Sequence, residues 1–166
     1  QTIEQGGSTD LHPRGGTGPY KFQILETEFV YEDPANRIGR IEGSTYSAGN
    51  SIGKVTIGAT DAESASDYVQ ITVLPERPQE FQADGTTGST STIALTWSYG
   101  KPGIDEFRIA RSIGGSYDQV AVLGATESSY TDTALSPSNT YEYRIYAAKG
   151  SYVSLPSHAG PLNSNQ

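Results

Sequence analysis

The chain has 166 residues, a formal net charge of −8, no cysteine and no methionine. Without cysteine it can form no disulfide framework, thiolate nucleophile or Cys-based zinc site. Its acidic balance, with no Lys/Arg cluster, excludes nucleic acids and anionic membranes as expected partners, and no run of 18 apolar residues predicts membrane insertion. The length allows two small domains, and 19 Gly, 9 Pro and 11 Tyr favour short strands and tight turns over helices.

The first half contains three segments that alternate apolar and polar residues, as strands with one buried face do. A glycine-rich turn, Gly15–Pro19, precedes the first of them. The polar segment Thr60–Asp67 is expected to be the hairpin loop between the last two. The three predicted strands are Tyr20–Ile24, Lys54–Ala59 and Tyr68–Val73.

A domain junction is predicted at Leu74–Pro78, where the alternation ends. Pro75 and Pro78 interrupt ladder pairing and stiffen the backbone there. We therefore expect one domain over residues 1–75 and a second over 76–166, the second ending in a short C-terminal tail.

The second half shows four sets of residues that strand alternation places toward a core. Turn signals separate them at roughly ten-residue spacing, which is typical of a β-sandwich. The sets are Ile93, Leu95 and Trp97; Phe107 and Ile109; Val120 and Val122; and Tyr141, Tyr143, Ile145 and Ala147.

Residues 79–160 resemble a fibronectin type III domain, because several of that family's features occur in its order. Trp97 stands where the family keeps its core tryptophan, and Phe107–Arg111 resembles the next strand. Tyr130–Tyr141 is similar to the corner between two later strands, with Leu135 and Tyr141 in the tyrosine-corner positions. Ala147 and the stretch Ser154–Ser157 resemble the end of the family's second-last strand and the start of its last.

Residues 5–74 resemble the immunoglobulin-like or cadherin-like repeats of bacterial surface proteins. The segments that carry this resemblance are Gly15–Tyr20, Ile41–Ala48, and the pair Val55–Asp61 and Val69–Val73. The first strand is abbreviated, so further modules are expected to precede this one. The two resemblances together imply an all-β chain of two tandem immunoglobulin-like β-sandwiches.

No catalytic set emerges from the sequence. The histidines, His12 and His158, lie in turn-rich regions near the termini, and there is no Gly-x-Ser-x-Gly elbow. Gly15–Gly18 is expected to be a turn rather than a phosphate cradle, because no helix or Lys-Ser/Thr pair follows it. We predict that the chain is not an enzyme and has no catalytic, cofactor-binding or metal residues.

Two binding hypotheses remain open at this point. Asp61, Glu63 and Asp67 in one loop could hold calcium or be ordinary solvated acids. Four tyrosines whose exposure is plausible could stack on sugars or be ordinary cross-strand residues. The loop Lys149–Pro156 lacks Arg-Gly-Asp, so integrin binding is not implied. The four tyrosines are Tyr99, Tyr117, Tyr146 and Tyr152.

The tandem organisation predicts a non-catalytic spacer or adhesion segment of a larger bacterial cell-surface or secreted protein. A bacterial or phage source is expected because the sequence has no cysteine for disulfides and no glycosylation sequon. Two alternatives remain: an accessory module, linker or carbohydrate-binding, of a secreted polysaccharide-degrading enzyme, and a phage tail-fibre decoration. The expected location is extracellular or on the cell surface. The expected partners are other domains of the parent chain and a host or cell-surface protein or glycan.

Overall fold

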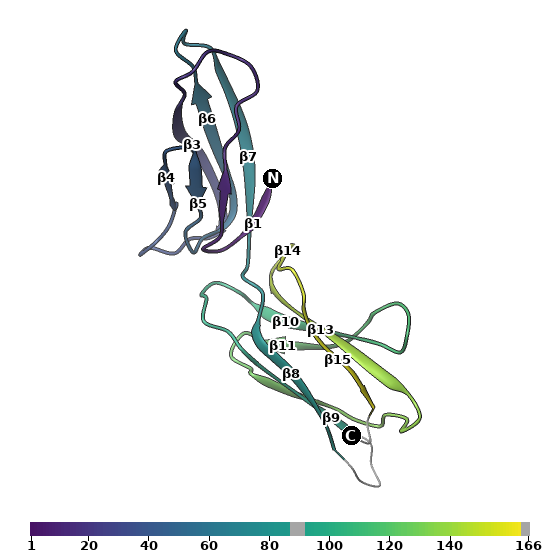
Figure 1. Ribbon diagram of the computed structural model, residues 1–166. Coiled ribbons are helices and arrows are strands. Elements are labelled where there is room, and N and C mark those ends of the chain that lie inside the picture. Colours follow the sequence, from purple (N-terminus) through teal and green to yellow (C-terminus); the bar gives the residue numbers. More distant parts are fainter. Residues whose placement is uncertain (87–91, 164–166) are drawn as a thin grey trace. The chain divides into compact units, whose positions relative to one another are not determined.

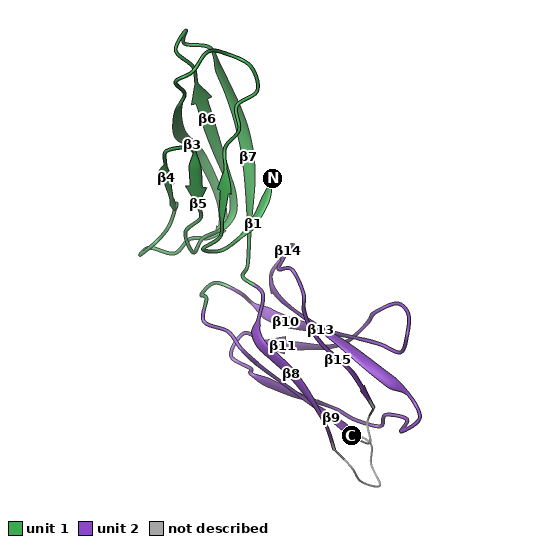
Figure 2. Ribbon diagram, viewed as in Figure 1, with its two compact units in different colours: residues 1–76, 101–103 green, residues 77–100, 104–166 purple. Residues whose placement is uncertain are grey.

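A computed structural model of the protein describes residues 1–86 and 92–163, so the last residues of the expected tail, 164–166, lie outside it. Every regular element in the described part is a β-strand, and that part contains no helix capable of spanning a membrane. The chain divides into two compact units (Figure 2). Unit 1 comprises Gln1–Glu76 and Lys101–Gly103, and unit 2 comprises Arg77–Gly100 and Ile104–Gln166.

Unit 1 is a sandwich of two sheets (Figure 1). The larger sheet has the strand order β1-β7-β6-β3, with β1 parallel to β7 and the other neighbours antiparallel. The smaller sheet has the order β2-β5-β4. The two short N-terminal strands therefore belong to different sheets, β1 to the larger and β2 to the smaller. The strands are β1 (Thr2–Glu4), β2 (Ser8–Asp10), β3 (Lys21–Tyr31), β4 (Arg40–Glu42), β5 (Thr45–Ser47), β6 (Ile52–Thr60) and β7 (Ser66–Leu74).

The core of unit 1 is largely aliphatic. Alternating residues of β6 and β7 face inward and are buried, as the sequence period predicts. Tyr46, in the predicted Ile41–Ala48 segment, is the large buried aromatic residue and donates a hydrogen bond from its hydroxyl to the carbonyl of Ile38 (2.7 Å). Its buried neighbours in this core are Leu11, Ala48, Val55, Ile57, Ile71 and Val73.

Strand β3 extends beyond the predicted Tyr20–Ile24 segment to Tyr31. Two β-bulges interrupt the alternation of apolar and polar residues along it. The register against β6 shifts between Ile24 and Glu26 and again between Phe29 and Tyr31. The residues inserted at the two shifts, Leu25 and Val30, are 58% and 50% exposed. Bulges re-aim side chains in this way, and they hid the second half of the strand from a period-two search.

Unit 2 is also a sandwich of two antiparallel sheets (Figure 1). One sheet has the order β11-β10-β13-β14, with β15 also paired to β13, and the other has the order β12-β9-β8. The strands are β8 (Gln79–Thr86), β9 (Thr92–Ser98), β10 (Glu106–Ser112), β11 (Asp118–Gly124), β12 (Ser129–Asp132), β13 (Thr140–Lys149), β14 (Tyr152–Val153) and β15 (Ser157–Asn163).

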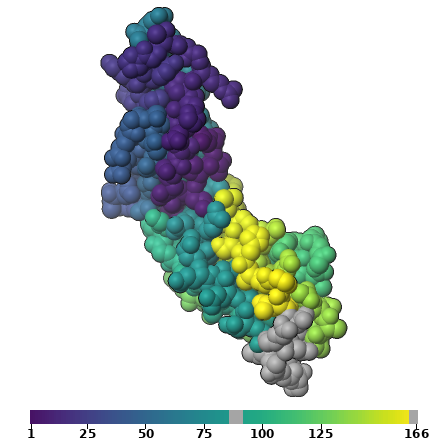
Figure 3. All heavy atoms as spheres, in the orientation of Figure 1, coloured from purple at the N-terminus to yellow at the C-terminus, as the bar shows by residue number. Residues whose placement is uncertain are grey.

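The predicted inward faces of β9, β10 and β13 form the core of unit 2. Trp97 is 5% exposed and meets the ring of Phe107 edge-on, with ring centroids 5.4 Å apart. Strand β15 contacts β8, and the space-filling view shows yellow C-terminal atoms beside the teal ones of that strand (Figure 3). The buried set is Ile93, Leu95, Trp97, Phe107, Ile109, Leu135, Tyr141, Tyr143, Ile145 and Ala147.

One predicted face in unit 2 is wrong in part. Val120 packs against the core as expected, but Val122 is 49% exposed, and Ala121 and Leu123 pack against the core as well. The register between β10 and β11 shifts so that Ile109 pairs with Ala121 while Ala110 pairs with Gln119. Val120 is the extra residue of this irregularity, and the phase of the strand changes across it.

Candidate functional site

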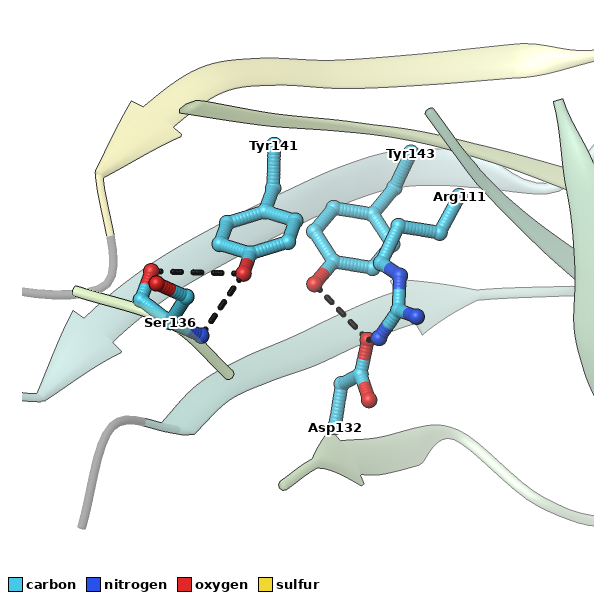
Figure 4. Close-up of polar contacts among 5 residues, drawn as sticks. All are labelled: Arg111, Asp132, Ser136, Tyr141 and Tyr143. Atoms are coloured by element: carbon cyan, nitrogen blue, oxygen red, sulfur yellow. Dashed lines mark hydrogen bonds and ion pairs between the residues drawn. The ribbon is translucent and has the colours of Figure 1, made fainter. Parts of the chain in front are cut away.

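The tyrosine corner of unit 2 forms as expected from the sequence. The hydroxyl of Tyr141 accepts a hydrogen bond from the amide of Ser136 (2.8 Å) and donates one to its carbonyl (3.2 Å) (Figure 4). Tyr141 is 2% exposed and Leu135 is 7% exposed. The ring is thus buried while its polar end pins the connection between β12 and β13.

A buried carboxylate next to the corner ties β10, β12 and β13 together. Asp132 Oδ2 accepts hydrogen bonds from Arg111 Nη1 and from the hydroxyl of Tyr143, each at 2.9 Å (Figure 4). Burial, together with the nearby Asp132 charge, raises the pKa of Tyr143 well above its usual range. No sequence pattern singled out this trio, because its members come from three strands that meet only in the fold. All its interactions are internal, so it stabilises the sandwich.

The four tyrosines of unit 2 considered for sugar stacking, Tyr99, Tyr117, Tyr146 and Tyr152, are half-buried, and Tyr99 and Tyr117 contact neighbouring side chains. Tyr99 packs edge-on to Phe107 at 5.3 Å between ring centroids. The Arg144 guanidinium lies 3.8 Å from the centroid of the Tyr117 ring, whose hydroxyl donates to Glu142 (2.7 Å). The most exposed of the large apolar side chains is instead Tyr68 of unit 1, at 73%.

The loop between β6 and β7, here called the Asp61 loop, is held by hydrogen bonds from backbone amides to the Asp61 carboxylate. Asp61 accepts hydrogen bonds from the amides of Thr17 (3.2 Å), Glu63 (2.9 Å) and Ala65 (2.8 Å). These bonds, that from Thr17 foremost, lower the pKa of Asp61. Gly16 must lack a side chain here, since it has φ +77° and its Cβ would lie 2.6 Å from Asp61 Oδ2. Within residues 1–86 and 92–163, no group of three potential ligands that could hold a metal is found, at this loop or elsewhere.

The Asp61 loop borders a cavity of about 560 Å³ in unit 1. The connection from β2 to β3 runs to the end of the unit where β6 turns into β7 (Figure 1), and the Thr17 carbonyl accepts a hydrogen bond from Ala62 there (2.9 Å). In the part of the chain that the structure describes, β1 pairs only with Thr72–Leu74 of β7. The first half of β7 therefore lies along the cavity as an open edge, where Asp67 accepts a hydrogen bond from the Tyr68 amide (2.7 Å).

The cavity has an apolar interior and a polar rim. Its apolar lining, Leu11, Phe22, Ile57 and Val69, belongs to the core cluster of unit 1 or packs against it. Polar and aromatic groups surround this lining, so the cavity can bury an apolar surface and hydrogen-bond its edges. The rim includes Asp10, His12, Arg14, Tyr20, Asp67 and Tyr68.

Sequence reasoning did not find this site. His12 is exposed, and the sequence pattern around Tyr68 predicts only a strand. The rim comes from the β2–β3 connection and the start of β7, more than 45 residues apart in the chain. The one local signal was the sequence His12-Pro13-Arg14 followed by glycines, which places exposed polar side chains on a loop.

Comparison with known proteins gives a family for the second half of the chain. The model of the fibronectin type III domain family matches residues 76–160. An amylopullulanase from Thermoanaerobacterium saccharolyticum is 34% identical over 65 residues, which are 38% of this chain and 5% of that enzyme. The chain thus corresponds to a small part of the length of this relative.

Solved structures similar to this chain include other modules of the same type. One, FN3tt, is 26% identical with a TM-score of 0.47 and is matched over 52% of this chain and 90% of its own. A Fn3-like protein from Clostridium thermocellum is 29% identical with a TM-score of 0.42, over 49% of this chain and 85% of its own.

The family match spans residues 76–160 of 166, and it contains the buried Trp97 and the bonded Tyr141 corner. The chain belongs to the fibronectin type III domain family.

Proposed function

We propose that this chain is a non-catalytic accessory segment of a larger secreted polysaccharide-degrading enzyme. The observation that carries the proposal is the 34% identity to a stretch of an amylopullulanase that makes up 5% of that enzyme. A short match of this kind is what a module shared between otherwise longer enzymes gives. It favours the accessory role over the adhesive role, for which the chain offers no comparable observation.

The chemistry of the described residues supports a non-catalytic role. Both histidines are exposed, and both buried carboxylates accept hydrogen bonds within the protein. Asp132 accepts from Arg111 and Tyr143, and Asp33 accepts from the Ala35 amide and the Asn50 side chain. Fibronectin type III domains serve generally as non-catalytic modules, and a shared fold does not carry a shared activity. In this role the partners are the catalytic domains of the parent chain, and the location is extracellular.

A zymogram tests the accessory role. Antibodies raised against the 166-residue chain should detect, in the culture medium of the source cells, a longer polypeptide whose band clears pullulan in a native gel. A longer polypeptide that stays on the cells and clears no polysaccharide would overturn the proposal in favour of adhesion.

A second measurement tests the non-catalytic claim separately. The purified chain, incubated with pullulan at the concentration that gives clearing by the parent band, should release no reducing sugar. Release above a heat-denatured control would show that the segment itself is catalytic.

A further inference from the structure

We infer that the unit 1 cavity is a binding site for a neutral glucan chain. This inference rests on the proposed function and adds to it a ligand class and a place. It assigns recognition to the unit that the fibronectin type III match does not cover, since that match begins at residue 76.

The size of the cavity fits a short oligosaccharide segment. Ligand-binding pockets typically have volumes of about 300–1,000 Å³, and this one has about 560 Å³. It opens along the edge of β7 that β1 leaves uncovered, so a polymer could lie across it without needing a free end.

The aromatic side chains are suited to the apolar faces of sugar rings. Tyr20 lines the cavity, and its hydroxyl is held by a hydrogen bond to the Gly15 carbonyl (2.7 Å), which restrains the ring before any ligand binds. Tyr68 lies at the rim with 73% of its surface exposed. The restrained, half-buried ring of Tyr20 and the exposed ring of Tyr68 together provide two stacking surfaces.

The polar rim offers both donors and acceptors for hydroxyl groups. Within residues 1–86 and 92–163, the side chains of His12 and Arg14 form no hydrogen bond or ion pair, so their N–H groups are available. Asp10 and Asp67 each accept a hydrogen bond within the protein, and a carboxylate has capacity for several more.

The charge of the rim selects against anionic ligands. Three carboxylates, Asp10, Asp61 and Asp67, outnumber the one arginine, Arg14, so a uronate, sulfate or phosphate group would meet net repulsion. A neutral sugar does not incur this cost. The enzyme similar to this chain is named for pullulan, which makes that polymer the natural probe.

An apolar strip beyond the rim favours a polymer over a single sugar. Gly58 pairs with Tyr68 across β6 and β7, and a Cβ on Gly58 would lie 2.8 Å from Leu25 Cδ1. Directly paired residues point to the same face of a sheet, so the Leu25 side chain packs over Gly58 on the face that carries Tyr68. Leu25 is 58% exposed, and the strip extends the binding surface from the rim onto the outer face.

Affinity electrophoresis of the whole chain in native gels containing pullulan tests the inference. The wild type should be retarded, and Tyr68→Ala should bind about tenfold more weakly because an aromatic contact is lost. Arg14→Ala, which removes the unpaired donor, should weaken binding by a comparable factor. Pullulan-derived oligosaccharides should compete, and glucose should not.

Two variants of residues that do not line the cavity serve as controls. Val30→Ala alters an apolar residue of β3 that does not line the cavity, and Tyr152→Ala removes a tyrosine of unit 2. Both should migrate as the wild type does. Equal retardation of all variants, or retardation of none including the wild type, would overturn the site. Binding competed by polylysine rather than by oligosaccharides would also overturn it, in favour of a basic peptide ligand.

The electrophoresis and the zymogram can fail independently. Pullulan binding by a chain whose parent clears no polysaccharide would leave the site standing without the accessory role. If the parent polypeptide degrades pullulan but the 166-residue segment does not bind it, the accessory role stands and the binding site does not.

Discussion

The two units bury their cores by different means. Unit 2 anchors its sandwich with large rings in fixed places, Trp97, Phe107 and the Tyr141 corner, and ties three strands together at Asp132. Unit 1 is built mainly from aliphatic residues with one buried tyrosine, Tyr46, and has a cavity of about 560 Å³ reaching its core. Buried rings and polar contacts thus fix the strands of unit 2, whereas the lining of the unit 1 cavity includes core residues that a ligand could contact.

The largest expected effect is the loss of the ring that anchors unit 2. Trp97→Ala should lower the free energy of unfolding of this unit by about 3–5 kcal/mol, because the cavity left behind cannot fully collapse. Unit 1 should keep its stability. Urea unfolding followed by two-dimensional amide NMR resolves the two units without relying on tryptophan fluorescence. Parallel loss of stability in both units would contradict the view that each has its own core.

The next effect concerns the polar tie of unit 2. Asp132→Ala should cost about 2–4 kcal/mol, because it leaves the partly buried Arg111 and the buried Tyr143 hydroxyl without their acceptor. Thermal unfolding by circular dichroism measures the loss. The double variant Asp132→Ala/Tyr143→Phe should lose less than the sum of the two single variants, since it removes both ends of one hydrogen bond. Additive losses would show that the bond contributes little.

Alkaline pH should test the buried tyrosine of unit 1. Burial raises the pKa of Tyr46 to about 12, above the value near 10 of the unfolded chain. Tyr46 therefore keeps its proton to a higher pH in the folded state than in the unfolded state. The stability that the protonated hydroxyl contributes is fully present below pH 10 and is lost as the pH rises from 10 through 12. Over that window the loss should approach about 1.4 kcal/mol per pH unit.

Tyr46→Phe separates this effect from general alkaline damage. The variant loses the hydrogen bond to Ile38, about 1 kcal/mol at pH 7, but the fall in stability of unit 1 above pH 10 should become shallower. Urea midpoints of unit 1 at pH 8 and pH 11 give both numbers. An unchanged slope would mean that Tyr46 does not control the alkaline limit.

The sequence predicted best where a residue type has few alternatives in a fold. Trp97, Leu135 and Tyr141 could be placed because their order along the chain resembles that of a fibronectin type III domain, in which the core tryptophan and the corner tyrosine have specific positions. The bulges at Leu25 and Val30 could not be predicted, because an inserted residue is visible only against its partner strand. The cavity rim could not be predicted either, because it depends on where β1 stops pairing with β7.

Strand β11 offers the smallest and sharpest test of that lesson. Because the register shifts opposite Ala110, Val122 points to solvent and Leu123 packs against the core. Val122→Ala should change the free energy of unfolding of unit 2 by no more than about 0.5 kcal/mol, while Leu123→Ala should cost about 2 kcal/mol. If the simple alternation were right, the order would reverse, with Val122 the costly substitution. Urea unfolding of the two variants measures the difference between their free energies of unfolding. If Leu123→Ala is the less stable variant the register is shifted, and if Val122→Ala is the less stable one the register is regular.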